Sequence, residues 1–312
     1  MTAMRILSDL PKQAPQRGLC LTIGNFDGLH LGHQALIRRA AEAARERGLD
    51  FAAMTFWPHP RALLHPGESR APLASRAERM RLLEAAGVPL AFELPFTAEL
   101  AAMSAREFVE RRLMPLSLSH LVVGHDFRMG RGRGDGADGL AELGRALGFT
   151  LESIPAVEAG GAPISSSRLR AAVAQGDVAL ARALLGRPHS ISGKIVHGDA
   201  RGRTLGFPTA NLGDIEGLPP GHGIYACVAH VKGKRLPAAV SIGVNPTFNG
   251  GKTTIEAFLL EGGGDLYGEA MRLDFIARLR DQRKFPSAEE LARQIAIDAA
   301  QAREILAKEA LA

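Results

Sequence analysis

The sequence predicts two domains: a parallel α/β domain, then a smaller β-barrel or β-sandwich that ends in a helix. The chain has 312 residues, which is more than one hydrophobic core usually serves. Strand and helix signals alternate through the first half, as is typical of a parallel sheet. At Gly186-Arg187-Pro188 the helix signals stop and short β-like runs begin. We therefore expect domains over residues 1–186 and 187–312.

The elements of the first domain follow from apolar runs and from helical periodicity. Strands or buried apolar segments are expected over residues 20–23, 51–56, 88–94, 120–124 and 149–154. Helices are expected over residues 33–47, 137–147, 165–175 and 177–185. Ser104 and Glu107 have the spacing of a capping box, which predicts that a further helix begins there.

The second domain is predicted mainly from β-like runs between turns rich in glycine and proline. These runs cover residues 191–197, 224–231, 238–244, 253–260 and 270–277. Ser287 and Glu290 also have capping-box spacing, and an amphipathic helix is expected from there towards Leu306. This order of elements is typical of a barrel or sandwich followed by one helix.

Composition favours a cytoplasmic protein without a membrane or nucleic-acid partner. No apolar run reaches the roughly 18 residues of a membrane span, and the N-terminal segment lacks the apolar stretch of a secretory signal. The net charge of +5 is spread along the chain, which favours a solvated surface over a nucleic-acid footprint. Cys20 and Cys227 lie in separate apolar runs, which favours buried, reduced thiols over a disulfide.

The first candidate site is the glycine-rich segment Gly24–His33, GNFDGLHLGH, between a predicted strand and a predicted helix. Its glycines let the backbone approach phosphate oxygens, and the start of the helix presents N–H groups to an anion. His30 and His33 are three residues apart, so both rings can face one spot. Two imidazoles there suit the negative charge that develops on a departing pyrophosphate.

The HxGH motif in this segment resembles the nucleotidylyltransferase superfamily. The whole string resembles the adenylyltransferase half of the bacterial bifunctional riboflavin kinase/FAD synthetase family. Three further segments resemble that family in the same order: Phe56–Pro60, Val123–Gly130 and Ile164–Arg170. The resemblance implies a Rossmann-like nucleotidylyltransferase domain, which would join ATP to a phosphate nucleophile.

The same resemblance implies roles for individual residues of this domain. His30 and His33 would be catalytic, and Asp126 and Arg128 would contact flavin. Asp27 either orients the loop or touches a ribose, and the sequence does not choose between these roles. The residues expected to bind ATP or its phosphates are Gly24, Asn25, Phe26, Asp27, Gly28, Gly32, Ser166, Ser167 and Arg170.

The second candidate site is the segment Gly193–Asn211, GKIVHGDARGRTLGFPTAN. It is not a Walker A loop, because the Gly-Lys-Ser/Thr end is missing. The segment resembles the riboflavin kinase signature GxVxxGxxxGRxLGFPTAN, although its Pro-Thr-Ala-Asn end taken alone is typical of a turn. The resemblance implies that Thr209 and Asn211 bind Mg²⁺, for which hydroxyl and amide oxygens are suitable ligands. The residues expected to bind ATP phosphates here are Gly198, Gly202, Gly206, Pro208, Thr209 and Asn211.

Glu256 is the expected base of the second site. It alternates with Ile255 and Ala257 in a β-like run, so it points either to solvent or into a site. The matching segment of the family carries the base, so Glu256 would take the proton of the ribityl 5′-hydroxyl as it attacks the γ-phosphorus of ATP. Arg280 is a candidate flavin or phosphate contact. The chain departs from the family pattern at Trp57, Met129, Ser167 and Gln282.

Together the two resemblances imply a bifunctional enzyme with a riboflavin-kinase-type β-barrel behind its α/β domain. Riboflavin and ATP would give FMN, and FMN and a second ATP would give FAD and pyrophosphate, with Mg²⁺ sharing the charge. Three alternatives stay open at this point. They are a monofunctional enzyme with one degenerate domain, a relative of the class I aminoacyl-tRNA synthetases, and a non-catalytic flavin-storage or regulatory protein.

Overall fold

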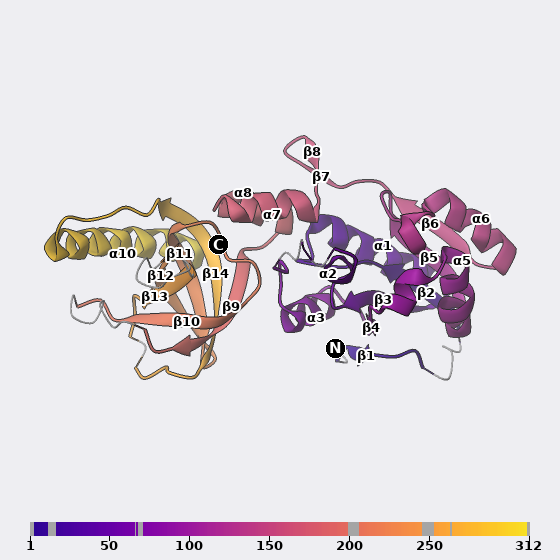
Figure 1. The fold of residues 1–312 in the computed structure, drawn as a ribbon, viewed down its shortest axis with the longest axis horizontal. Helices are drawn as coiled ribbons and strands as arrows, with labels where there is room; N and C mark the ends of the chain where they lie inside the picture. The colour runs from indigo at the N-terminus through magenta and orange to yellow at the C-terminus, as the bar shows by residue number, and fades with distance from the viewer. Residues whose placement is uncertain are drawn as a thin grey trace. The chain divides into compact units, whose positions relative to one another are not determined.

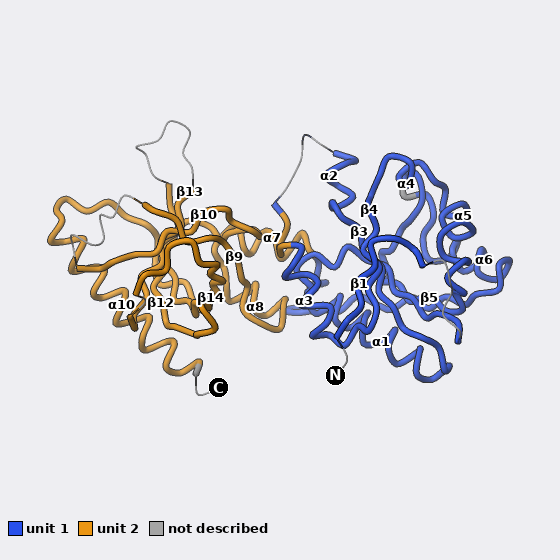
Figure 2. Tube along the Cα trace, turned by 90° about the horizontal axis from the view of Figure 1, so that it is seen from below, with its two compact units in different colours: residues 1–71, 76–165 blue, residues 72–75, 166–312 orange. Residues whose placement is uncertain are grey.

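The protein divides into two compact units, shown in Figure 2. The computed structural model describes residues 3–11, 17–65, 67, 71–198, 206–244, 253–262 and 264–310. The first unit comprises Met1–Ala71 and Arg76–Ser165, and the second comprises Pro72–Ser75 and Ser166–Ala312. This division places the helices α7 (Ser166–Ala174) and α8 (Val178–Leu185) with the barrel. The domain limits 1–186 and 187–312 remain a prediction.

A six-stranded, all-parallel sheet forms the centre of the first unit (Figure 1). Its strand order is β1-β4-β3-β2-β5-β6. The strands are β1 (Arg5–Leu7), β2 (Leu19–Ile23), β3 (Asp50–Trp57), β4 (Leu90–Pro95), β5 (Leu118–Gly124) and β6 (Thr150–Ile154). The predicted parallel α/β fold is confirmed. The sequence did not indicate β1, because this strand has only three residues and none of them is buried.

Helices cover both faces of this sheet, because the strand side chains alternate between the faces. Leu19, Leu21 and Ile23 pack in one core with α5, α6 and the π-helix η2, whereas Cys20 packs in a second core with α1 and α3. The helices of this unit are α1 (Leu31–Arg47), α2 (Pro60–Leu64), α3 (Arg76–Ala85), α4 (Ala98–Ala102), α5 (Ala105–Phe108), η2 (Val109–Leu113), η3 (Met114–Leu116), η4 (Arg131–Arg133) and α6 (Ala137–Leu147). A two-stranded hairpin, β7 (Glu158–Ala159) and β8 (Ala162–Pro163), follows β6.

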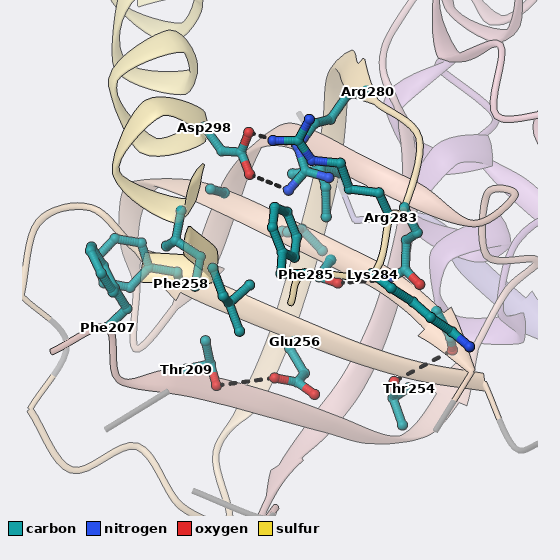
Figure 3. Close-up of a pocket in the computed structure, with 18 of the residues that line it drawn as sticks. Phe207, Thr209, Thr254, Glu256, Phe258, Arg280, Arg283, Lys284, Phe285 and Asp298 are labelled. Carbon is teal, nitrogen blue, oxygen red and sulfur yellow. Dashed lines mark hydrogen bonds and ion pairs between the residues drawn. The ribbon is translucent and has the colours of Figure 1, made fainter. Parts of the chain in front are cut away.

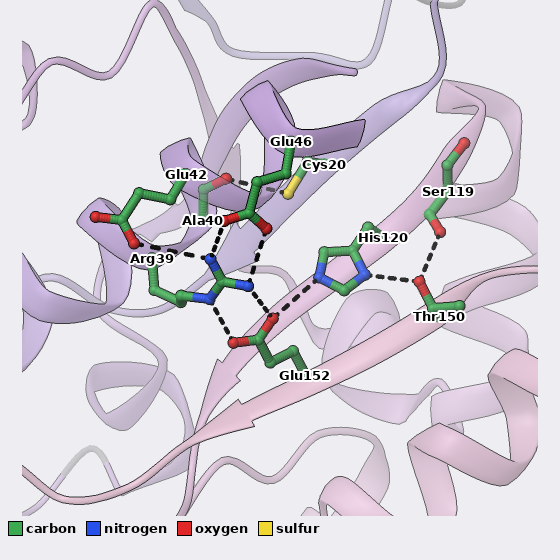
Figure 4. Close-up of polar contacts among 9 residues, drawn as sticks. All are labelled: Cys20, Arg39, Ala40, Glu42, Glu46, Ser119, His120, Thr150 and Glu152. Carbon is green, nitrogen blue, oxygen red and sulfur yellow. Dashed lines mark hydrogen bonds and ion pairs between the residues drawn. The ribbon is translucent and has the colours of Figure 1, made fainter. Parts of the chain in front are cut away.

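Towards the amino ends of the strands, an ionic cluster ties α1 to the sheet (Figure 4). Arg39 of α1 donates to both carboxylate oxygens of Glu152 in β6, at 2.6 and 3.0 Å, and to Glu46 at 3.0 Å. The buried His120 of β5 contacts Thr150 Oγ1 through Nδ1 at 2.6 Å, and its Nε2 lies 3.6 Å from Glu152. The pKa of His120 is lowered, chiefly by burial and next by the nearby positive charge of Arg47. The carboxylate of Glu152 opposes this shift. This cluster lies away from the loop that follows β2.

Both cysteines are buried thiols, as the sequence predicts. Cys20 Sγ donates to the carbonyl oxygen of Ala40 at 3.3 Å. Burial raises the pKa of Cys20 to about 12, and burial raises the pKa of Cys227 well above its usual value. A thiol with so high a pKa is a poor nucleophile at neutral pH, so neither cysteine suits covalent catalysis.

The second unit is a closed, antiparallel six-stranded barrel, in the order β10-β13-β12-β11-β14-β9. The strands are β9 (His189–Val196), β10 (Thr209–Glu216), β11 (Gly223–Val231), β12 (Lys234–Val244), β13 (Thr253–Leu259) and β14 (Ala270–Arg280). Closure decides between the barrel and the sandwich. Thr209 and Asn211 lie in a strand, although their segment alone is typical of a turn. Pairing to β9 and β13 on either side fixes β10 as extended chain.

The helix α10 (Ala288–Ala310) covers part of the outer surface of the barrel. It begins after Ser287, whose hydroxyl accepts from the N–H of Glu290 at 3.2 Å, as the capping-box spacing predicts. Its apolar residues Ala299, Ala302 and Leu306 pack in one cluster with side chains of the barrel. Within the described ranges, no helix combines the length and the apolar character that crossing a membrane requires.

Candidate active sites

The segment Gly24–His33 forms a loop at the carboxyl end of β2, and α1 begins within it at Leu31. Phe26 and Leu29 adopt left-handed backbone angles, with φ of 47° and 42°, and Gly28 has φ of 76°. Such angles cost free energy for residues that carry a Cβ, so they persist where the surrounding structure holds them. Gly28 is the residue type that adopts this conformation without strain. The loop therefore has a specific, supported shape.

His30 and His33 come together at the start of α1. The rings are stacked, with their centroids 3.7 Å apart and their planes inclined by 13°. His30 is the N-cap residue, and its Nδ1 accepts from the backbone N–H of His33 at 3.3 Å. Because Nδ1 is an acceptor, a neutral His30 carries its proton on Nε2. The structure thus gives this imidazole a defined tautomer.

His33 is held neutral. Burial, and after it the repulsion from His30, lower the pKa of His33 well below its usual value. Its Nδ1 is buried and makes no hydrogen bond to any part of the chain that the structure describes. A buried polar atom without a partner is costly, and an anionic or polar ligand at this helix terminus would supply that partner.

The other residues expected at the first site lie in two places. Asp126 and Arg128 are exposed in the turn after β5, and β5 pairs with β2, so this turn and the Gly24–His33 loop follow the same ends of neighbouring strands. Ser166 and Ser167 begin α7, and Arg170 lies one turn further on. These three residues belong to the second compact unit, and their part in the first site remains a prediction.

A buried ion pair beside this loop escaped the sequence analysis. Arg79 of α3 donates to Glu93 of β4 at 2.9 Å, and both side chains are almost fully buried. Helical periodicity does not reveal such a partner. The available signal was Glu93 itself, an acidic residue within the apolar run of β4.

The second candidate site is a cavity of about 720 Å³ on the outer face of the barrel (Figure 3). Strand alternation creates this face: Ile255 and Ala257 of β13 lie in the barrel core, while Thr254, Glu256 and Phe258 line the cavity. Glu256 therefore points into a site. Side chains of β10 and β12, the segment after β14 and the start of α10 supply the other walls.

Three oxygen-bearing side chains converge in this cavity. Asn211 of β10 is paired in register with Glu256 of β13, and Thr209 Oγ1 donates to Glu256 Oε2 at 3.4 Å. A Cβ at Gly198 would overlap the Asn211 amide, so a larger residue there would displace that side chain. A hydroxyl, an amide and one carboxylate suit Mg²⁺. Among the described residues no group of three or more His, Cys, Asp or Glu could hold a metal, so phosphate and water oxygens would have to complete such a site.

The remaining phosphate-binding candidates adjoin β10. Gly206 has φ of 84°, and Pro208 directly precedes the strand. Gly202 lies outside the described residues, as do residues 245–252 between β12 and β13. The walls of the cavity also contain aromatic rings, with Phe207 and Phe258 in edge-to-face contact at 5.3 Å. Rings of this kind suit a planar aromatic ligand.

Two family models match successive parts of the chain. Residues 12–168 match a family model described as FAD synthetase, and residues 185–306 match one described as riboflavin kinase. A bifunctional riboflavin kinase/FMN adenylyltransferase of Escherichia coli K12 is 40% identical over 294 residues, which is 94% of both chains. The protein of that description from Pseudomonas fluorescens is 39% identical, over 98% of this chain and 99% of its own.

The chain belongs to the bifunctional riboflavin kinase/FMN adenylyltransferase family. It is a transferase with both activities, and together they make FAD. The fold also matches a crystal structure described as a macrolide-efflux protein of Streptococcus pneumoniae, with a TM-score of 0.86, 31% identity, and coverage of 97% of this chain and 99% of that one. These matches do not support the alternatives of an aminoacyl-tRNA synthetase relative or a non-catalytic storage protein.

Arg280, the candidate ligand contact of the second site, is held by hydrogen bonds within the second unit. Its guanidinium donates to both carboxylate oxygens of Asp298 in α10, at 2.9 and 2.6 Å, and to the carbonyl oxygen of Asp281 at 2.9 Å (Figure 3). These bonds tie β14 to α10 at the cavity wall. A flavin contact by Arg280 remains a prediction. Asp298 was missed, although an acidic residue on the apolar face of a predicted helix was a usable signal.

Gln282 departs from the family pattern at the mouth of the same cavity. Its Nε2 donates to Ser241 Oγ of β12 at 3.0 Å, and both residues line the cavity. A glutamine can donate this bond, whereas an ionised acid at that position could only accept one. The serine hydroxyl could also donate to an acid, so this bond does not explain the departure.

Proposed function

We propose that each activity has its own ATP site. The loop Gly24–His33 would adenylylate FMN, and the outer cavity of the barrel would phosphorylate riboflavin. We also propose that residues 1–186 and 187–312 carry the two activities separately. The convergence of Thr209, Asn211 and Glu256 in one cavity is the observation that supports this assignment most directly.

In the kinase step, Glu256 would act as general base. Its carboxylate lies in the cavity beside a hydroxyl donor, so it can accept the proton of the ribityl 5′-hydroxyl as that oxygen attacks the γ-phosphorus. Thr209 and Asn211 would hold Mg²⁺ together with the ATP phosphates. A bound Mg²⁺ supplies neutralisation of the charge on the phosphate oxygens. The aromatic walls, including Phe207 and Phe258, would bind the isoalloxazine ring.

In the adenylylation step, the phosphate of FMN is already an anionic nucleophile, so no base is needed. The contribution of the protein is alignment and stabilisation of the leaving pyrophosphate. His30 would donate from Nε2, and His33 would gain a partner for its buried nitrogen. Ser166, Ser167 and Arg170 would bind phosphate as well, and Asp126 and Arg128 would contact the flavin.

Incubation of the protein with riboflavin, ATP and Mg²⁺, followed by chromatography of the flavins, tests the assignment. FMN should form first and FAD should follow, with one pyrophosphate released for each FAD. Chelation of Mg²⁺ should stop both steps. FAD formation from riboflavin without any FMN intermediate would contradict the order proposed here. Formation of FMN alone would contradict the role of the first site.

We further propose that the enzyme works in the cytoplasm. Its two cysteines are buried, unpaired thiols, a state that suits a reducing compartment. Both steps also consume ATP, which the cytoplasm supplies.

A further inference from the structure

A positive charge is buried under the carboxyl edge of the parallel sheet. The Arg79 side chain is 3% exposed, and the side chain of its partner Glu93 is 1% exposed. Removal of two charges from water costs about as much as their attraction returns, so a buried ion pair often adds little stability compared with an apolar pair. Stability alone therefore does not account for this ion pair. The contacts of Arg79 indicate that it holds nearby backbone segments in place.

The guanidinium of Arg79 spans three neighbouring strands. Nη1 donates to the carbonyl oxygen of Asn25, in the loop after β2, at 3.2 Å, and to that of Phe56, near the end of β3, at 3.3 Å. Nη2 donates to Glu93 of β4 at 2.9 Å. Arg76 donates to the other carboxylate oxygen of Glu93 at 2.6 Å. Glu93 thus orients the guanidinium of Arg79, and that guanidinium holds two backbone segments in place.

The carbonyl of Asn25 lies in the Gly24–His33 loop, directly before a strained residue. The next residue, Phe26, has φ of 47°, which is unfavourable for a residue with a large side chain. Two buried donors hold that carbonyl, namely Arg79 and the hydroxyl of Thr55 at 3.1 Å. These bonds oppose relaxation of the backbone just before the strained residue.

The same guanidinium also contacts the segment Trp57–Pro60. Its Cζ lies 5.2 Å from the centroid of the Trp57 ring, within the range of a cation–π interaction. Trp57 is the single tryptophan of the chain. One side chain therefore joins two segments that resemble the adenylyltransferase half of the family, and a natural fluorophore lies directly against it.

We propose that Arg79, held by Glu93, is a positioning residue for adenylyl transfer. It does not touch the reacting atoms. It sets the conformation of the Gly24–His33 loop and of the Trp57–Pro60 segment, so that the nucleotide and the FMN phosphate meet in line. This proposal rests on the proposed function of the first site.

Kinetics of the full-length enzyme test it, because the riboflavin kinase activity of each sample reports on folding. Arg79→Met alone would leave the buried Glu93 with only the half-exposed Arg76 as an ionic partner. The principal variant is therefore the double change Arg79→Met with Glu93→Leu, which removes both buried charges. We expect its kcat for FAD formation from supplied FMN to fall about 100-fold, because a misplacement of about 1 Å is enough for such a loss. The KM for ATP should change less than kcat, and riboflavin kinase kcat should stay within about twofold, since its site lies on the other unit.

Arg81→Met is the matched control. Arg81 lies on the same helix and also pairs with an acidic residue, Glu78, but its side chain is half exposed. This variant should keep both activities and the emission spectrum of Trp57. The double variant should shift that emission, because it removes the cation from the indole. Arg79→Lys keeps the charge without the fork and should recover only part of the lost kcat.

Two results would overturn the proposal. One is a double variant that makes FAD with the kcat of the wild type. The other is equal loss of both activities in the double variant, which would show a general structural role. If the wild-type enzyme itself forms FMN but no FAD, the proposed function of the first site fails instead, and the two failures are thereby distinguished.

Discussion

The two candidate sites are built in opposite ways. At the first, a strained loop and the start of a helix present backbone groups and two stacked imidazoles. At the second, side chains project from paired strands, so that the register of β10 and β13 places Thr209, Asn211 and Glu256 close together. In the barrel, hydrogen bonding of the backbone holds the strands that carry the candidate side chains, whereas the loop at the first site has separate buried supports. The proposed base also belongs only to the second site, where the nucleophile is a neutral hydroxyl.

The largest expected effect tests whether a general base acts at the second site alone. Glu256→Gln keeps the shape of the side chain and removes the acceptor of the hydroxyl proton, so riboflavin kinase kcat should fall by about 10²–10⁴-fold. FAD formation from supplied FMN should continue at the wild-type rate. Glu261→Gln, an exposed change just after β13, is the control. Loss of both activities in folded Glu256→Gln protein would contradict separate sites.

Loss of the two histidines of the first site is expected to have a smaller effect on activity. His30→Ala combined with His33→Ala removes both imidazoles from the start of α1, and we expect FAD formation to fall by about 10²–10³-fold, as for lost stabilisation of a developing charge. FMN formation should persist in the same sample. Measurement of both products over time gives the two rates. An unchanged rate of FAD formation would show that backbone groups alone stabilise the leaving pyrophosphate. The control variant is His222→Ala, which removes a histidine from an exposed position.

Sequence reasoning predicted one kind of feature well and missed another. The strands and helices that carry strong periodicity, such as α6 over Ala137–Leu147, agree with their predicted ranges. Glu256 could be assigned to a site because alternation separates it from Ile255 and Ala257, and the resemblance decided which face mattered. β10 could not be predicted locally, since its extended form depends on pairing to strands before and after it in the sequence.

The ion pairs that support the two sites could be predicted only in part, for a related reason. Arg79 and Glu93, and likewise Arg280 and Asp298, are pairs whose members lie on different elements. Glu93 and Asp298 each stand out as an acidic residue among apolar neighbours, but the sequence does not say that Arg79 and Arg280 are their partners. Only the packing of the elements shows that the charges are buried together, and a single sequence contains no direct record of that packing.

The smallest expected effect concerns stability of the first unit. Burial lowers the pKa of both His33 and His120, so each of these histidines binds a proton at a lower pH in the folded protein than in the unfolded chain. As the pH falls through about 6.5, the unfolded state gains protons and the free energy of unfolding decreases, by on the order of 1 kcal/mol for each unit of pKa difference. Thermal unfolding measured between pH 7.5 and pH 5.5 tests this.

A variant separates the contribution of His120 from the rest. His120→Asn removes the titrating group and keeps a side chain that can bond to Thr150. The melting temperature of this variant should depend less on pH across the same range than that of the wild type. An identical pH dependence in the two proteins would show that His120 does not contribute.

Closure of the barrel has a consequence for association between chains. Each of its six strands has two neighbours, so within the described residues the barrel has no edge strand to which a strand of another molecule could add. The parallel sheet ends instead at β1 and β6, and β1 is only three residues long. Closure thus protects the barrel against edge-to-edge aggregation, whereas the α/β sheet keeps two edges, the very short β1 and β6.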